Sequence, residues 1–186
     1  MALPSTTYKI ELNLTDMDRS VYADHNVIIA RHPSEADERM MIRLVAMALQ
    51  AHQLQTVCGG DGTLAFGAGL SNPDEPDVWL RDFTQATRLW IEVGAPEEKP
   101  ILRACGKSDS MMVYCFNHAA EIWWKAIENK VSRAKNLQVW RVPTLQSQEL
   151  AKLATRSMQL QATIQEGALM MSDGANTIDV ECVRWQ

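Results

Sequence analysis

Apolar and polar residues alternate along the first part of the chain. Every second residue from Tyr8 to Leu14 is apolar, which is typical of a β-strand with one buried face. Turn-forming residues occupy positions 15–20, and the extended pattern resumes over 21–30. The pattern predicts an N-terminal β-hairpin whose Ile and Leu side chains share one buried face.

The apolar period becomes helical after Ser34. Ser34 is a favourable N-cap, and the acids that follow it suit the positive end of a helix. A stripe of apolar residues then recurs at helical spacing, namely Met41, Leu44, Val45 and Ala48. We predict a helix from Glu35 to Leu54, with Glu38 in its first turn, facing whatever lies at the helix entrance.

The segment 55–76 is rich in Gly, Asp, Asn and Pro and is predicted to be a loop or lid with a short helix. Its glycines do not form a phosphate-binding loop, because no Gly-Lys-Ser or Gly-Lys-Thr follows them. Two apolar runs come next, at 78–82 and 88–93, separated by a turn at 84–86. These runs predict a second pair of strands.

Helices and strands alternate over the rest of the chain. Helices are predicted at 97–106, 119–130 and 144–155, the last capped by Thr144, and strands at 111–116, 137–142, 157–165, 168–171 and 177–185. This order implies an α+β fold, in which a mixed β-sheet carries flanking helices. We expect a single domain spanning residues 1–186.

Composition narrows the functional classes. A chain of 186 residues with 46% hydrophobic and 22% charged residues is ordinary for a globular protein. The N-terminus has no basic segment followed by an apolar one, and no run approaches the roughly 18 apolar residues that span a bilayer. We therefore expect a cytoplasmic protein without a membrane partner. The scattered cysteines and histidines suggest neither a structural zinc nor a disulfide framework, and no serine lies in a nucleophile-elbow context.

Charge is distributed unevenly. The net charge of -5 argues against tight, nonspecific nucleic-acid binding. Residues 71–99 are predominantly acidic, however, whereas 123–141 are predominantly basic. An acidic metal pocket beside a basic rim suits a phosphodiester substrate. The alternative is that each charge run is simply a solvated face.

Asp77 and Glu92 are the strongest candidates for a functional site. Each carboxylate lies in or beside an apolar, strand-like run, where an anion must meet water, a cation or a hydrogen-bond donor. Carboxylates on neighbouring strands suit Mg²⁺ or Mn²⁺, which need few protein ligands. The alternative is two surface acids on a hairpin.

The helix with Glu38 and the two strands resemble the core of the PD-(D/E)XK nuclease superfamily. Pro76-Asp77 matches the start of the first strand, and Glu92 matches the acid of the second. The resemblance implies that Asp77, Glu92 and the Val93 carbonyl hold the metal. It also implies a lysine two residues after Glu92, where this sequence has Gly94.

The chain as a whole resembles the YaeQ family, over nearly its full length. The resemblance is carried by 30–35 running into 38–44, by 75–80, 89–94 and 122–124, and by 160–167. It implies a small bacterial cytoplasmic protein with a variant nuclease-like core, an added N-terminal hairpin and a C-terminal meander. No settled activity comes with this resemblance.

Gly94 leaves the role of the lysine vacant. Arg31 and Gln161 lie within the family-like blocks and are the candidates to fill it. Arg31 is equally well explained by an ion pair with Glu35 or Glu38, and Gln161 by a satisfied polar position in a sheet.

Two functions follow as hypotheses. In the first, Asp77, Glu92 and Val93 bind Mg²⁺ or Mn²⁺, Glu38 orients the attacking water, Arg31 or Gln161 replaces the lysine, and the protein hydrolyses phosphodiesters. In the second, the same fold is a catalytically impaired adaptor that binds nucleic acid or a protein partner. The sequence does not fix the oligomeric state.

Overall fold

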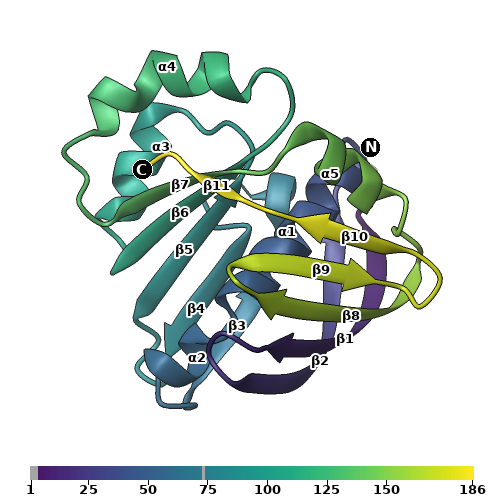
Figure 1. Cartoon of the computed structure of the whole chain (residues 1–186). Helices are drawn as coiled ribbons and strands as arrows, with labels where there is room; N and C mark the ends of the chain where they lie inside the picture. The colour runs from purple at the N-terminus through teal and green to yellow at the C-terminus, as the bar shows by residue number, and fades with distance from the viewer. Residues whose placement is uncertain (1–3, 73) are drawn as a thin grey trace.

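The strands of the computed structural model form two separate sheets rather than the single mixed sheet expected from the sequence (Figure 1). The structure describes residues 4–72 and 74–186. The predicted domain, 1–186, therefore includes positions 1–3 and 73, which lie outside the described residues. Each sheet contains both parallel and antiparallel pairs, so the α+β class and the mixed pairing are confirmed.

The five-stranded sheet joins the two ends of the chain. Its order is β10-β9-β8-β1-β2, where β1 runs parallel to β8 and the other pairs are antiparallel. Its bounds are β1 (Thr6–Asp16), β2 (Val21–Arg31), β8 (Ser157–Gln165), β9 (Ala168–Ser172) and β10 (Thr177–Val180). Ile10, Leu12 and Leu14 of β1 are all buried, which confirms the predicted hairpin face.

The six-stranded sheet has the order β11-β7-β6-β5-β4-β3. Its bounds are β3 (Gly62–Phe66), β4 (Val78–Asp82), β5 (Thr87–Val93), β6 (Ser110–Cys115), β7 (Leu137–Arg141) and β11 (Val183–Arg184). The strands β5, β6 and β7 are parallel, whereas β3, β4 and β11 pair antiparallel to their neighbours.

The strand β3 lies inside 55–76, which we predicted to be a loop. Its short sequence begins with glycine and has no clear apolar alternation, so it gives little local signal. Pairing with β4 supplies the backbone hydrogen bonds that make it a strand.

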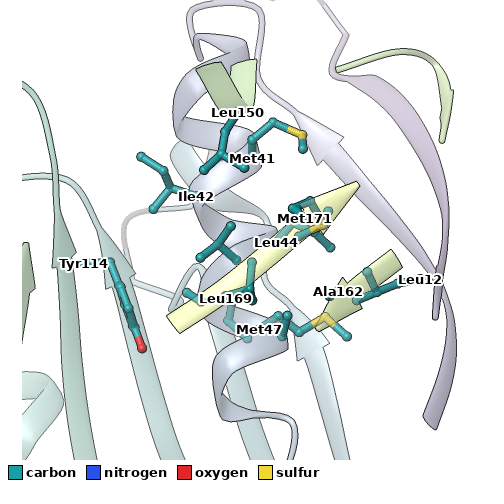
Figure 2. Close-up of a cluster of buried hydrophobic side chains, with 14 of the residues drawn as sticks. Leu12, Met41, Ile42, Leu44, Met47, Tyr114, Leu150, Ala162, Leu169 and Met171 are labelled. Carbon is teal, nitrogen blue, oxygen red and sulfur yellow. The ribbon is translucent and has the colours of Figure 1, made fainter. Parts of the chain in front are cut away.

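One helix is enclosed between the two sheets. The helices are α1 (Asp37–Gln50), α2 (Gln53–Thr56), α3 (Glu98–Cys105), α4 (Ala120–Val131) and α5 (Thr144–Ala151), with a 3-10 turn η1 (Gly69–Ser71). Every residue of α1 from Met40 to Ala48 is buried. Met47 of α1 and Leu169 and Ala162 of the five-stranded sheet, all labelled in Figure 2, belong to one core cluster with residues of both sheets. The predicted helix is therefore present, and its burial extends beyond the stripe of apolar residues to the rest of its circumference.

The start of α1 differs from the prediction. The helix begins at Asp37 rather than Glu35, and its N-cap is Ala36, which makes no side-chain capping bond. The Ser34 hydroxyl instead lies 2.6 Å from the His32 ring nitrogen Nδ1. Glu35 is thereby left outside the helix, and its buried side chain takes part in the site described below.

The outer face of the six-stranded sheet carries a second, smaller core. There α3 and α4 cover β6 and β7 (Figure 1), and Ile101, Ile127 and Val113 pack together. Among the described residues, no helix is long and apolar enough to cross a membrane.

Two predicted C-terminal elements are shorter than expected. The strand predicted at 177–185 divides into β10 and β11, which belong to different sheets. The helix predicted at 144–155 ends at Ala151. Thr144 was predicted to cap it, but the N-cap is Pro143, and the Thr144 hydroxyl accepts a hydrogen bond from Arg141 at 3.1 Å. The segment after β10 therefore bridges the two sheets.

Candidate functional site

The antiparallel register of β4 and β5 brings Asp77 beside Glu92. Val78 pairs with Ile91, so the preceding residue reaches the level of Glu92. The Asp77 amide donates to the Ile91 carbonyl at 2.9 Å, which extends the ladder by one position. The structure thus brings together the two carboxylates that the sequence identified.

Asp77 is buried and bound by several donors. The Arg39 Nη2 atom donates to both carboxylate oxygens, at 2.8 and 2.7 Å. The Val93 amide donates to Oδ2 at 2.7 Å. Val93 was predicted to offer its carbonyl to a metal, but the group that it offers to Asp77 is its N–H. Backbone and guanidinium donors together supply hydrogen bonds to both oxygens of this buried carboxylate.

Two arginines and two carboxylates form a buried ion network. Arg39 also donates to Glu35 at 2.5 Å, and Arg43 lies 3.3 Å from Glu35 and 3.4 Å from Asp77. Burial works against the charge of Arg39, yet Asp77 and Glu35 raise its pKa above the ordinary value. The charges of the four side chains balance, which is the condition under which buried ions persist.

Sequence reasoning missed Glu35, Arg39 and Arg43 as members of the site. The sequence did contain a signal for them. Glu35, Arg39 and Arg43 are each four residues apart, and in a helix residues with this spacing lie on the same face. Arg43 also interrupts a run of apolar residues that is otherwise fully buried. A cation at such a position requires a buried counter-ion.

The loop after β3 closes over Arg43. The Gly67 carbonyl accepts a hydrogen bond from Arg43 Nη2 at 2.9 Å. Gly69 has a φ of +58°, and a Cβ atom there would lie 2.9 Å from Arg43 Nη1. Both the positive φ and the close guanidinium therefore favour glycine at this position.

Glu92 is poised to gain or lose a proton near neutral pH. Burial and then the neighbouring charge of Asp77 raise its pKa to about 7. The Trp90 indole N–H donates to Glu92 Oε1 at 2.8 Å, which partly opposes this rise. A carboxyl group with a pKa near 7 beside a second carboxylate is typical of functional sites.

Space is open beside Glu92 at Gly94. The backbone there has a φ of +117°, which favours glycine, and nothing lies within 4 Å of the position that a Cβ atom would take. A side chain from position 94 is therefore disfavoured by the backbone rather than by crowding.

Glu38 has a different partner from the one predicted. Its Oε1 atom accepts a hydrogen bond of 2.5 Å from Ser147, which is buried in α5. Within residues 4–72 and 74–186, no three His, Cys, Asp or Glu side chains come together as a group that could hold a metal ion. The expected convergence of Glu38 with Asp77 and Glu92 is not formed in this conformation.

Arg31 and Gln161 do not replace the missing lysine in this structure. Arg31 donates to the Glu35 carbonyl at 2.7 Å and pairs with Asp37 at 3.4 Å, so it anchors the turn into α1. Gln161 is exposed on β8, between the buried Leu160 and Ala162, and lines the outer side of the five-stranded sheet. The alternation along β8 turns its side chain away from the core.

Comparison with known proteins identifies relatives over the whole chain. A family model described as "YaeQ protein" matches residues 1–182. A Salmonella typhi protein, "Uncharacterized protein YaeQ", is 41% identical over 187 residues, covering 100% of this chain and 98% of the relative.

Solved structures of similar proteins share the fold. The crystal structure of YaeQ protein from Xanthomonas axonopodis pv. citri has a TM-score of 0.88 and 38% identity, covering 98% of each chain. The crystal structure of YaeQ protein from Pseudomonas syringae has a TM-score of 0.89 and 34% identity, covering 100% of this chain and 98% of that chain. The two-sheet arrangement is therefore shared with these proteins.

Proposed function

The chain belongs to the YaeQ family, and we propose that its six-stranded sheet is a variant PD-(D/E)XK nuclease core that hydrolyses phosphodiesters with Mg²⁺ or Mn²⁺. Asp77 and Glu92 supply the hard oxygen ligands, and Val93 positions Asp77 through its amide. The bound cation supplies charge stabilisation for the phosphoryl oxygens and an activated water.

We base this proposal on the position of Arg39. Its guanidinium lies on Asp77, and Asp77 adjoins Glu92 next to the space that Gly94 leaves open. A lysine from position 94 is absent, but a cation from α1 binds Asp77 directly and lowers the pKa of Glu92 through its charge. Arg39 is thus the candidate to neutralise a phosphate in the role for which Arg31 and Gln161 were expected.

The two carboxylates fit a divalent cation in charge and ligand type. Burial and then the neighbouring charge of Asp77 raise the pKa of Glu92, and a bound divalent cation would favour the charged form of Glu92. In the described conformation Arg39 covers both oxygens of Asp77. Cation binding therefore requires Arg39 to turn away from Asp77, and Glu35 remains as its buried partner.

Cleavage assays with single-stranded and supercoiled DNA and with RNA, in Mg²⁺ or Mn²⁺, test this proposal. We expect cutting by the wild type and a loss of about 100-fold or more in Glu92→Gln and Arg39→Gln. Arg39→Lys retains the charge and is expected to recover part of the activity.

A matched control is Arg103→Gln, which removes an arginine that is 60% exposed and whose ion-pair partner among the described residues is the exposed Asp74. It is expected to cut at the wild-type rate. Absence of cutting by the wild type, or equal cutting by Glu92→Gln, would contradict the enzyme proposal.

The second candidate function is a non-catalytic adaptor for nucleic acid or protein. The specific observation in its favour is that Asp77 is already bound by Arg39 and Val93, with Arg43 close by. Such a network also serves a purely structural role. Exposed bases on and after α4 supply a contact surface, namely Lys125, Lys130, Arg133 and Lys135.

Salt-dependent binding distinguishes the adaptor. It predicts nucleic-acid binding without cutting, with a salt slope that falls when the α4 bases are neutralised. Nucleic-acid binding that does not change with salt or with neutralisation of these bases would contradict an adaptor for nucleic acid. The adaptor hypothesis would then apply to protein partners alone.

A further inference from the structure

A cavity that is separate from the carboxylate site lies between elements of the two sheets. Its volume is about 540 Å³, which is within the range of roughly 300–1,000 Å³ for small-molecule pockets. The walls come from the end of α1, the neighbouring strands β6 and β7, the β8–β9 hairpin and the segment that links the sheets. Principal lining residues are Leu49, Gln50, Tyr114, Trp140, Ile164 and Cys182.

Tyr114 offers this cavity an unused hydrogen-bond donor. Its side chain is 1% exposed, and its ring lies at the β6 side of the core in Figure 2. The hydroxyl oxygen accepts a hydrogen bond of 2.9 Å from Gln50 Nε2. Among the described residues, no acceptor is hydrogen-bonded to the phenolic proton. The hydroxyl hydrogen is therefore available to an acceptor on a ligand in the cavity.

The floor of the cavity is uncharged. Burial raises the pKa of Tyr114 above its ordinary value, so the phenol stays protonated. Burial likewise raises the pKa of Cys182 to about 12, which keeps this group a thiol. At the rim, Arg19 is paired with Asp16 at 3.0 Å, and the nearby Glu166 and Glu181 are exposed. The rim therefore has two exposed carboxylates and an arginine that is already paired, and these charges disfavour an anionic ligand.

The walls favour a flat molecule. Tyr114 and Trp140 are register partners on β6 and β7, so their side chains lie next to each other on the same face of the sheet. Leu49 and Ile164 add apolar surface from α1 and β8. Aromatic and aliphatic walls bind ring systems by apolar burial and offset stacking.

We propose that this cavity is a binding site for a small, uncharged, planar heteroaromatic molecule whose ring acceptor takes the phenolic proton of Tyr114. The ring lies against Trp140, and Gln50 holds the Tyr114 hydroxyl in place. This site is independent of the carboxylates, because none of Asp77, Glu92 and Arg39 lines it.

Quinoline and naphthalene are matched probes for this site. They have nearly the same shape, but only quinoline has a ring nitrogen that accepts a hydrogen bond. Titration at pH 7.5 in EDTA is followed by the Trp140 indole resonance. We expect saturable shifts with both probes and about five-fold tighter binding of quinoline, the usual magnitude for one hydrogen bond.

Tyr114→Phe keeps the ring and removes the donor. In this variant the two probes are expected to bind equally, whereas the control Tyr22→Phe, at a residue that is 71% exposed, keeps the preference for quinoline. Ala168→Leu narrows the cavity and is expected to weaken both probes. If either probe fails to shift Trp140 in the wild type, or if the wild type does not prefer quinoline, the proposal is wrong whatever the variants show.

Discussion

Arg43 is fully buried, and its charge is balanced by carboxylates from two different parts of the chain. Glu35 precedes α1 and Asp77 precedes β4, so this one side chain ties the helix to the six-stranded sheet. Buried ion pairs add little net stability, but breaking one leaves an uncompensated charge. The contribution of Arg43 is therefore visible mainly when a single partner is removed.

We predict that Arg43→Met lowers the free energy of unfolding by about 3–5 kcal/mol, because Glu35 and Asp77 lose a buried counter-ion. The double variant Arg43→Met, Glu35→Gln is expected to be less destabilised than the sum of its single changes. Urea unfolding measures both values, and Arg103→Met is the exposed control. Additive changes would show that Arg43 and Glu35 are not coupled.

The protonation of Glu92 makes stability depend on pH. The folded chain holds this proton up to a pH of about 7, whereas the unfolded chain releases it near the ordinary value of 4.5. The folded state therefore binds more protons between these values, and Glu92 contributes less to stability as the pH rises through them. Above pH 7 that contribution is lost.

Glu92→Gln removes this dependence. The free energy of unfolding of the variant minus that of the wild type is expected to increase by about 1–3 kcal/mol from pH 4.5 to pH 8, because the folded and unfolded states of the wild type differ in the pKa of Glu92. Urea unfolding in EDTA at pH 4.5, 6 and 8 gives the comparison. A difference between wild type and variant that is constant across these pH values would mean that Glu92 has an ordinary pKa.

At the level of elements, α1 organises the molecule because both sheets pack against it. Leu44 is fully buried in the core cluster that includes residues of both sheets. We predict that Leu44→Ala costs about 3–5 kcal/mol of unfolding free energy, from lost burial and a cavity that the rigid surroundings fill poorly. Leu102→Ala on α3, where the side chain is 40% exposed, is the control in thermal or urea unfolding. An equal loss of unfolding free energy in Leu44→Ala and Leu102→Ala would contradict the claim that α1 organises the core.

The sequence was informative about elements wherever the local pattern was strong. Ile10, Leu12 and Leu14 alternate, and their strand and buried face were predicted correctly. In contrast, β3 consists of five residues with no alternation, and its formation depends on pairing with β4. The start of α1 was misjudged, because Ser34 satisfies His32 instead of capping the helix.

At the level of the whole molecule, the division into two sheets depends on contacts between distant segments. The parallel pairing of β1 with β8 joins residues about 150 positions apart, and no local pattern encodes it. The same limit applies to the site. The acids Asp77 and Glu92 were recognised from their strands, but Arg39 reaches Asp77 from α1, and its orientation depends on how that helix packs between the sheets.

Paramagnetic line broadening by Mn²⁺ tests the central claim that Asp77 and Glu92 bind a divalent cation. The Trp90 indole N–H is a direct reporter, because it donates to Glu92 at 2.8 Å, and the indole of Trp140, which donates to Gln138, is the internal control. We predict that substoichiometric Mn²⁺ broadens the Trp90 indole resonance before that of Trp140, and that Glu92→Gln abolishes this selectivity. Equal broadening of both indole resonances, or unchanged selectivity in Glu92→Gln, would contradict the proposed cation site.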